Sequence, residues 1–311
     1  MDIGSNIKDN REKNNITQKE LANALGLEAT TISKYESNKI LPSIDILKKI
    51  SEIFGISVDE ILKTEEFDLS RINLYKILKE QKEMKLKGNI YHNTQILFTY
   101  NTNHIEGSTL TEEQTRFIFE TKSVLFEKDT IINVDDMIET TNHFELIDYM
   151  IDTAYETLTE ELIKKYHAIL KKSTFDSKKE WFNVGEYKSL SNSVGDIKVS
   201  SPKNVKKDIQ NLLKEYNKLE KIEIEDIIKF HADFEKVHPF QDGNGRIGRI
   251  IAFKECLRNN IIPFIILEKD KLFYYRGLSE YQKGKEKGYL IDTCLNAQDK
   301  YILMIKKYLN C

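Results

Sequence analysis

The sequence is poor in residues that break helices or cross-link a chain. Its 311 residues include only 4 prolines and 13 glycines, which favours long helices. The 3 cysteines (Cys256, Cys294 and Cys311) form no Cys-X-X-Cys pair, which excludes a disulfide scaffold and is typical of a reducing compartment. The longest apolar run, around residues 261–267, is far below the roughly 20 residues that span a bilayer. The first fifteen residues also lack the apolar core of a signal peptide, so we expect a cytoplasmic protein with no membrane partner.

Neither sign of charge is in excess. The 47 basic and 50 acidic residues leave a net charge of −3, so no global field attracts nucleic acid, and any DNA binding has to come from local geometry. A composition of 40% apolar and 31% charged residues is typical of a globular protein. The length predicts about two domains of roughly 150 residues, or one short module and a larger one.

The first sixty residues read as a series of short helices. Thr17 and Glu20 have the spacing of a capping box that begins a helix, and Gly26 ends that helix. After a three-residue break a second helix follows, and Ser43 and Ser57 mark the starts of two more.

This segment, over about residues 5–62, resembles the Cro/C1-type (XRE-like) helix-turn-helix family of phage repressors. The matching positions are Gln18, Leu21, Ala22, Leu25, Gly26, Ile32, Glu36, Pro42 and Leu47. Asn38 stands where glycine is usual, but asparagine also tolerates the left-handed backbone. The resemblance implies a five-helix DNA-binding domain at residues 1–64 whose helix 28–37 enters the major groove. It places Ala29, Thr30 and Lys34 near base edges, and Gln18, Thr31 and Asn38 near phosphates.

The charge of this segment limits its affinity for DNA. Residues 1–64 hold nine basic and ten acidic residues, a net charge of −1. Because neutralised phosphates supply most of the affinity, we expect one copy to bind DNA weakly, and a homodimer on a two-fold operator is favoured. The alternative is a small helical module that contacts only protein.

The rest of the chain is predicted to be mainly helical. Residues 65–90 read as a connecting helix or linker, and residues 91–311 as a second domain. Helices are expected at 111–126, 135–155, 159–171, 205–220, 224–236 and 245–258. One β-hairpin is expected at 187–200, where short β-branched and polar stretches flank Asn192 and Gly195. The expected fold class is all-α with this one small hairpin.

Residues 237–250 (VHPFQDGNGRIGRI) form a loop between two predicted helices. Gly243 and Gly245 let backbone amides converge where the second helix begins, which favours an anion. Arg246 and Arg249 lie three residues apart, so both would reach one phosphate chain. Asp242 suits Mg²⁺ that is shared with phosphates.

His238 is the nearby group whose ordinary pKa lets it accept a proton near neutrality. The run GNGRIG also matches the dinucleotide-binding fingerprint, but that fingerprint needs a strand before its first glycine, and here Pro239 and a helical segment precede it. The patterns of kinases and of P-loop proteins are absent.

The run HPFQDGNGRIGR is similar to the Fic family motif HxFx(D/E)GNGRxxR at every defined position, and the resemblance covers about residue 90 to the C-terminus. It implies a helical fold that transfers AMP from ATP to a Ser, Thr or Tyr hydroxyl of a target protein. His238 would be the general base, and Phe240 would anchor the loop. Asp242 would hold Mg²⁺, with Mn²⁺ as the alternative. The backbone of Gly243, Asn244 and Gly245 would cradle phosphates, and Arg246 and Arg249 would neutralise the leaving pyrophosphate.

Two further segments gain a role from this resemblance. The expected hairpin, with Ser191, Asn192, Ser193, Val194 and Gly195, looks like the family's flap that pairs with the target's backbone; an ordinary hairpin is the alternative.

The second segment is TNHIEG, with Thr102, Glu106 and Gly107, on a helix expected near 93–107. It is similar to the inhibitory pattern (S/T)xxxE(G/N), in which Glu106 would pair with Arg249 in place of the ATP γ-phosphate. The same carboxylate would alternatively orient a water that removes AMP from a modified target.

The sequence therefore predicts an autoinhibited protein adenylyltransferase joined to a DNA-binding module. A transcriptional regulator that uses the Fic core as a nucleotide sensor is the alternative. Other Fic proteins transfer UMP, phosphocholine or phosphate, but both glycines and both arginines of the motif favour ATP. Tyr274 or Tyr275 is a candidate wall of the adenine pocket.

Overall fold

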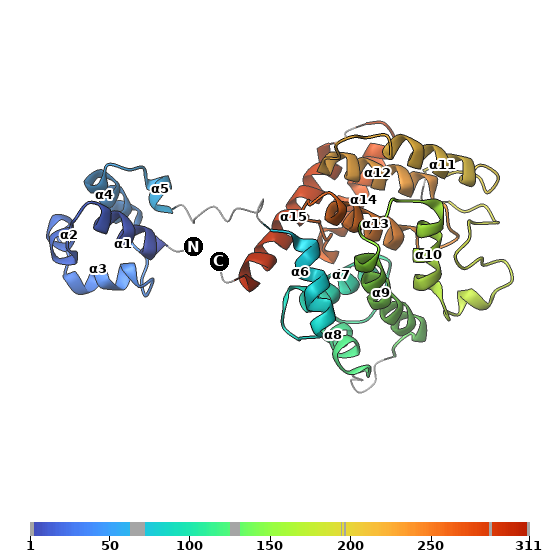
Figure 1. Ribbon diagram of the computed structural model, residues 1–311, viewed down its shortest axis with the longest axis horizontal. Helices are drawn as coiled ribbons and strands as arrows, with labels where there is room; N and C mark the ends of the chain where they lie inside the picture. The colour runs from blue at the N-terminus through green and yellow to red at the C-terminus, as the bar shows by residue number, and fades with distance from the viewer. Residues whose placement is uncertain are drawn as a thin grey trace. The chain divides into compact units, whose positions relative to one another are not determined.

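The computed structural model describes residues 3–62, 72–124, 131–193, 195, 197–285 and 288–309. The chain divides into two compact units, Met1–Ile72 and Asn73–Cys311 (Figure 1). Over the described residues the regular structure is helical and contains no β-strand, which confirms the all-α fold class. None of the described helices is long and apolar enough to cross a membrane.

The first unit contains the five expected helices. They are α1 (Ile3–Lys13), α2 (Gln18–Leu25), α3 (Ala29–Glu36), α4 (Ile44–Phe54) and α5 (Val58–Leu62). Each contributes apolar side chains to one core, in which Ile7, Leu21, Ile32 and Ile50 have no exposed surface. The helical spacing of these residues in the sequence is the reason that the five helices can share that core.

The predicted helix ends of this unit are confirmed. The Thr17 hydroxyl accepts a hydrogen bond from the Glu20 amide at 3.2 Å, and the Glu20 carboxylate accepts one from the Thr17 amide at 2.8 Å. Gly26 ends α2 in the left-handed conformation, with a φ of 69°. Asn38, which replaces the usual glycine, also has a left-handed φ of 54°.

The second unit is a larger helical assembly. Its α-helices are α6 (Leu74–Met84), α7 (Ile90–Ile105), α8 (Glu112–Thr121), α9 (Val134–Asp152), α10 (Glu160–Lys171), α11 (Val205–Tyr216), α12 (Ile224–Val237), α13 (Asn244–Arg258), α14 (Lys271–Gln282) and α15 (Gly288–Tyr308), with short 3₁₀ turns η2 (Asp176–Lys178) and η3 (Glu268–Asp270). The predicted helices correspond to α8 to α13. No helix is predicted from the sequence at the positions of α14 and α15. Helix α6 lies within the segment that we interpreted as a connector, and it packs on α7 and α9.

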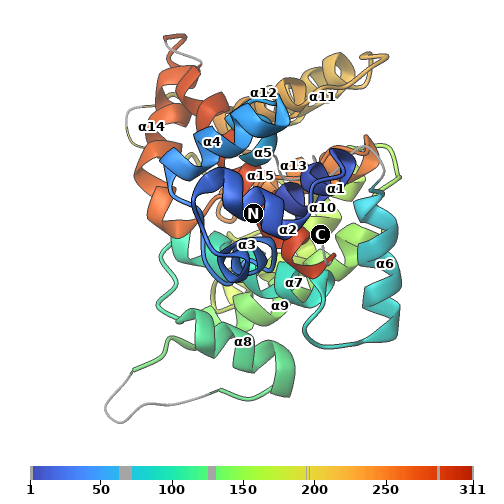
Figure 2. The ribbon, with the colours of Figure 1, turned by 90° about the vertical axis from the view of Figure 1, so that its left-hand side faces the viewer.

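Helix α13 is the central element of the second unit. It contacts α6, α7, α9, α10 and α12, and 13 of its 15 residues are buried. Helices α11 and α12 lie side by side in both views (Figures 1 and 2). A helix that is buried on all sides has no solvated face for its charged residues, so the arginines of α13 have to find partners inside the protein.

The expected β-hairpin at 187–200 is wrong over the described residues. The Lys188 amide donates to the Pro239 carbonyl at 2.9 Å, and the Ser200 amide donates to the Val237 carbonyl at 3.3 Å. The backbone of this segment therefore bonds to the end of α12 and to the loop after it instead of to a second strand. Val194 lies outside the described residues.

Candidate active site

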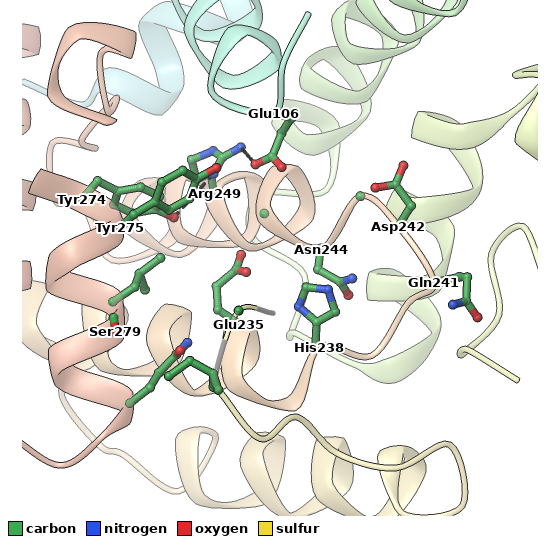
Figure 3. Close-up of a pocket in the computed structure, with 16 residues that line it drawn as sticks. Glu106, Glu235, His238, Gln241, Asp242, Asn244, Arg249, Tyr274, Tyr275 and Ser279 are labelled. Carbon is green, nitrogen blue, oxygen red and sulfur yellow. Dashed lines mark hydrogen bonds and ion pairs between the residues drawn. The ribbon is translucent and has the colours of Figure 1, made fainter. Parts of the chain in front are cut away.

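A cavity of about 410 Å³ opens where α12 ends and α13 begins. Its wall comes from six parts of the chain: the end of α7, the segment with Gly195 and Ile197, the end of α12, the loop 238–243, the start of α13 and one side of α14 (Figure 3). The lining residues include Glu106, Glu235, His238, Asp242, Gly243, Gly245, Arg249 and Tyr275. Most of the motif residues that the sequence singled out, though not Arg246, are thus gathered around one space, together with the distant Glu106.

Two left-handed residues shape the loop between α12 and α13. His238 ends α12 with a φ of 52°, and Gly243 begins α13 with a φ of 82°. A left-handed conformation is uncommon for a residue other than glycine, and at His238 it turns the chain sharply after the helix. The side chain of Asn244 bonds back to this loop. Its oxygen accepts a hydrogen bond from the Phe240 backbone amide, and its nitrogen donates one to the Phe240 carbonyl, both at 2.8 Å. The loop is therefore closed by its own side chain.

A buried histidine supports this loop from α10. The His167 ring stacks on the Phe240 ring with 4.0 Å between centroids. Its Nδ1 accepts a hydrogen bond from the Gly185 amide at 2.9 Å, so its Nε2 carries the proton and donates to the Asp242 carbonyl at 3.2 Å. Burial lowers the pKa of His167 to about 3, which keeps the ring neutral and this pattern of donors intact.

His238 is placed to accept a proton from a group in the cavity. Its ring lines the cavity and is labelled beside Asn244 in Figure 3. Burial, together with the positive charge of Lys188, lowers the pKa of His238 to about 4. The imidazole is therefore neutral at pH 7, as a proton acceptor has to be.

The carboxylate of Glu106, at the end of α7, lies against the amino end of α13. An added Cβ at Gly245 would lie 2.3 Å from Oε1 of Glu106, so the carboxylate occupies the space directly against the helix end. Backbone amides and the positive end of the helix dipole favour an anion at such a position. Glu106 thus fills the place where the sequence predicts a phosphate.

Arg249 is the second partner of this carboxylate. Its Nη2 lies 2.6 Å from Oε1 of Glu106, and its Nε donates to the Thr102 hydroxyl at 2.7 Å. Thr102 and Glu106 are one helical turn apart, so both face the same guanidinium. Gly107 follows with a φ of 104°, where α7 has ended.

Arg246 does not share the cavity with Arg249. Its guanidinium bonds to Glu139 of α9 and lies 3.3 Å from Oδ2 of Asp242. Lys171 of α10 contacts the same two carboxylates, with 2.7 Å to Asp242. Burial alone would raise the pKa of Asp242, but the positive charges of Arg246 and Lys171 outweigh it and hold that pKa well below its usual range.

Asp242 is the candidate metal ligand. Its side chain is 47% exposed and borders the cavity beside the amino end of α13. One carboxylate beside the amino end of a helix fits Mg²⁺ that keeps several waters and shares itself with phosphates. The described residues contain no group of three or more His, Cys, Asp or Glu side chains that would hold a metal by themselves.

The segment that was expected to form the flap lies along the motif loop. The Asn192 amide donates to the Phe240 carbonyl at 3.1 Å, and its oxygen accepts from the Lys188 ammonium at 2.7 Å. Ser191 and Ser193 are exposed, and Gly195 borders the cavity. This segment is therefore held beside the site as a loop.

Helix α14 forms the far wall of the cavity. Tyr274 is fully buried, and its hydroxyl lies 2.6 Å from Nε2 of His231. Tyr275 is 40% exposed and donates to the Ile105 carbonyl at 3.2 Å, which ties α14 to the end of α7. Both tyrosines line the cavity.

In the first unit, α3, the predicted recognition helix, leaves several predicted DNA-binding residues accessible. Thr30 and Lys34 are exposed, and Ala29 and Thr31 are half-buried. The Gln18 amide instead donates to the buried Glu36 at 2.8 Å, and Glu36 also pairs with Arg11 at 2.6 Å. The Asn38 oxygen accepts from the Gly4 amide at 2.9 Å. Gln18 and Asn38 thus each contact another helix of the unit.

The charged residues of the site that were not singled out from the sequence include Glu139, Lys171, Lys188 and Glu235. Glu235 lies three residues before His238, so helical spacing would have placed it on the same face. Glu139 and Lys171 are far from the motif in sequence, and only the packing of α9 and α10 against α13 brings them to it.

Comparison with known proteins agrees with these two units. Residues 157–255 match the Fic/DOC family model, and residues 7–61 match a helix-turn-helix family model. The protein adenylyltransferase Fic of Nematostella vectensis is 26% identical over 194 residues, which are 60% of this chain and 43% of that relative. The transcriptional activator BcrR of Enterococcus faecalis is 39% identical over 66 residues, which are 21% of this chain and 32% of that relative. The chain therefore spans less than half the length of either relative.

A solved structure supports the fold. A Fic domain containing signaling protein from Bacteroides thetaiotaomicron superposes with a TM-score of 0.56 and 24% identity, over 76% of this chain and 92% of that one. At this identity the similarity establishes the shared fold.

Proposed function

The chain is a Fic/DOC-family protein with an N-terminal helix-turn-helix domain, and from that premise we propose that it is an autoinhibited protein adenylyltransferase. It would transfer AMP from ATP to a side-chain hydroxyl of a target protein. One observation carries the proposal: a neutral histidine, an anion-binding helix end and a buried arginine face the same cavity.

In the proposed reaction, the oxygen of the target hydroxyl forms a bond to the α-phosphorus of ATP. The bond between that phosphorus and the oxygen that bridges it to the β-phosphate breaks, and pyrophosphate leaves. The hydroxyl proton passes to the imidazole of His238. The amides at 243–245 and Arg249 stabilise the phosphates. Mg²⁺, or Mn²⁺ in its place, would be held by Asp242 and would neutralise charge on the leaving group.

The contact between Glu106 and Arg249 supports autoinhibition of this reaction. Glu106 lies against the amino end of α13 and pairs with Arg249. It therefore competes with the terminal phosphate of ATP for the helix end and for the guanidinium. Nucleotide would then bind with its phosphates displaced from the geometry needed for transfer. We expect the resting protein to be mostly inactive.

A labelling experiment tests the proposed activity. The Glu106→Gly chain is incubated with a cell extract, Mg²⁺ and ATP that carries its label on the α-phosphate, and the products are analysed by intact-mass spectrometry. We expect a target protein to gain the mass of one AMP, and a matched Glu106→Gly/His238→Asn chain to give far less of this product over the same time. Transfer of label from γ-labelled ATP but not from α-labelled ATP, or an added mass other than AMP, would contradict the proposal.

We also propose that the first unit binds DNA through α3, with a homodimer on a two-fold site as the binding form. The support is the exposure of Thr30 and Lys34 on the helix that corresponds to the recognition helix of helix-turn-helix proteins.

An electrophoretic shift with the DNA upstream of its own reading frame tests this proposal. We expect Lys34→Ala to weaken binding by about 5- to 150-fold, because a base contact is worth about 1–3 kcal/mol. Lys49→Ala makes the same charge change at an exposed site on α4 and should have a smaller effect. Equal binding by the parent and Lys34→Ala would contradict the assignment of α3. Tight binding that ATP alters would favour a nucleotide-sensing regulator.

A further inference from the structure

Glu235 is a carboxyl group that the proposed reaction leaves without a role. It lies in the last turn of α12, one turn before His238, and it lines the cavity. Its Oε1 is buried and has no hydrogen-bond partner among the described residues. A buried polar atom without a partner is destabilising, so its presence in a binding cavity calls for a functional explanation.

The backbone of α13 makes room for this carboxyl group. An added Cβ at Gly248 would lie 2.7 Å from Oε1 of Glu235 and 2.9 Å from Nδ1 of His231. Any side chain at residue 248 would therefore displace the carboxyl group. Figure 3 shows that it points toward α13, with His238 on one side and Tyr275 and Ser279 on the other. This position lies between the phosphate-binding end of the cavity and the wall formed by α14.

We propose that Glu235 is a nucleotide-binding residue whose carboxyl group donates a hydrogen bond to an acceptor oxygen, phosphate or sugar, of the bound nucleotide. This inference rests on the proposed nucleotide-binding function of the cavity. It adds a protein group that neither the Fic motif nor the inhibitory pattern contains.

The surroundings keep this carboxyl group protonated. Burial raises the pKa of Glu235 to about 8; Arg249 opposes that shift, and the negative charge of Glu106 adds to it. The other titratable groups that line this part of the cavity or border the carboxyl group are His231 and His238 of α12, Asp242 of the loop, and Tyr274 and Tyr275 of α14. A carboxylate here would repel a triphosphate, whereas the neutral acid is a donor for its oxygens.

The proposal predicts an unusual pH dependence. If the protonated form alone binds ATP, the dissociation constant rises as pH increases through 8, and between pH 7 and pH 9 it should rise about tenfold. Glu235→Gln has the same shape and keeps a donor that does not titrate in this range. We expect its affinity at pH 7 to lie near that of the parent and to lack this added pH dependence. Glu235→Ala should bind about two- to tenfold more weakly at pH 7.

Calorimetric titration of the full-length chain with ATP and Mg²⁺ tests these expectations. Glu225→Gln on the exposed start of α12 is the matched control and should follow the parent at every pH. Thermal unfolding of each variant verifies that it is folded. Identical pH dependence in the parent and Glu235→Gln, or equal affinity of Glu235→Ala and the parent at pH 7, would overturn the inference alone. Absence of ATP binding by the folded parent would overturn both this inference and the proposed function. If ATP binds with the expected pH dependence but no AMP is transferred, only the proposed function is overturned.

Discussion

Replacing His238 by asparagine in a Glu106→Gly chain is expected to lower the rate of AMP transfer by about 10²- to 10⁴-fold, the usual contribution of a positioned general base. The ring lines the cavity and is neutral at pH 7, so its loss removes the acceptor for the hydroxyl proton. Single-turnover transfer of α-labelled AMP to the target measures the effect. The affinity for ATP should change little, because the phosphates are held by other groups.

Asparagine at residue 238 removes the proton acceptor without straining the backbone, so the two effects can be told apart. His238 has a left-handed φ of 52°, which asparagine tolerates and alanine does not. We expect His238→Ala to lose at least as much activity and also some thermal stability. A His238→Asn chain that transfers AMP at the parental rate would remove the histidine from the chemistry, whatever alanine does.

The same assignment predicts how the rate depends on pH. The base is active when neutral, and burial and Lys188 lower the pKa of His238 to about 4. The transfer rate should therefore hold as pH falls from 7 to about 5, and it should drop near pH 4. An inflection near pH 6.5, the ordinary pKa of histidine, would show that the ring is solvated in the working enzyme.

Replacing Glu106 by glycine is expected to raise transfer by about 5- to 150-fold, the range of a coupling free energy of 1–3 kcal/mol. The substitution frees Arg249 and the amino end of α13 for the terminal phosphate of ATP. The measurement is the initial rate of labelling with α-labelled ATP, both of the target and of the chain itself.

Two controls make this experiment specific. Glu106→Gln keeps the length of the side chain without its charge, so we expect an intermediate rate. Glu113→Gly removes an exposed carboxylate from α8 and should leave the rate unchanged. Equal labelling by the parent and Glu106→Gly would contradict autoinhibition.

The removal of AMP from a modified target tests the alternative role of Glu106, in which its carboxylate orients a water. The side chain is 28% exposed, so it has access to water as well as to Arg249. If it orients a water that hydrolyses AMP from the target, the parent should remove label from a pre-modified protein with Mg²⁺ or Mn²⁺, and Glu106→Gly should not. Label that persists equally with both chains would exclude this reaction.

Local sequence signals were sufficient for much of this molecule. The capping box at Thr17, the turns at Gly26 and Asn38, and the loop between α12 and α13 depend on neighbouring residues, so the sequence predicts them directly. The motif residues could be found for the same reason, because they lie within twelve positions. The expected contact of Glu106 with Arg249 came from a family resemblance, since nothing in the intervening chain indicates it.

Only the tertiary structure decided the partners of the charged groups and of the segment at 187–200. Arg246 bonds to Glu139, and Asp242 to Lys171, because the central position of α13 removes water and leaves α9 and α10 to supply the counter-charges. The same packing places residues 188–192 against the motif loop, where the Lys188 backbone amide and the Asn192 side chain donate to the carbonyls of Pro239 and Phe240 instead of to a second strand. Burial likewise raises the pKa of Glu235 and keeps it protonated, and the sequence does not reveal how deeply this side chain is buried.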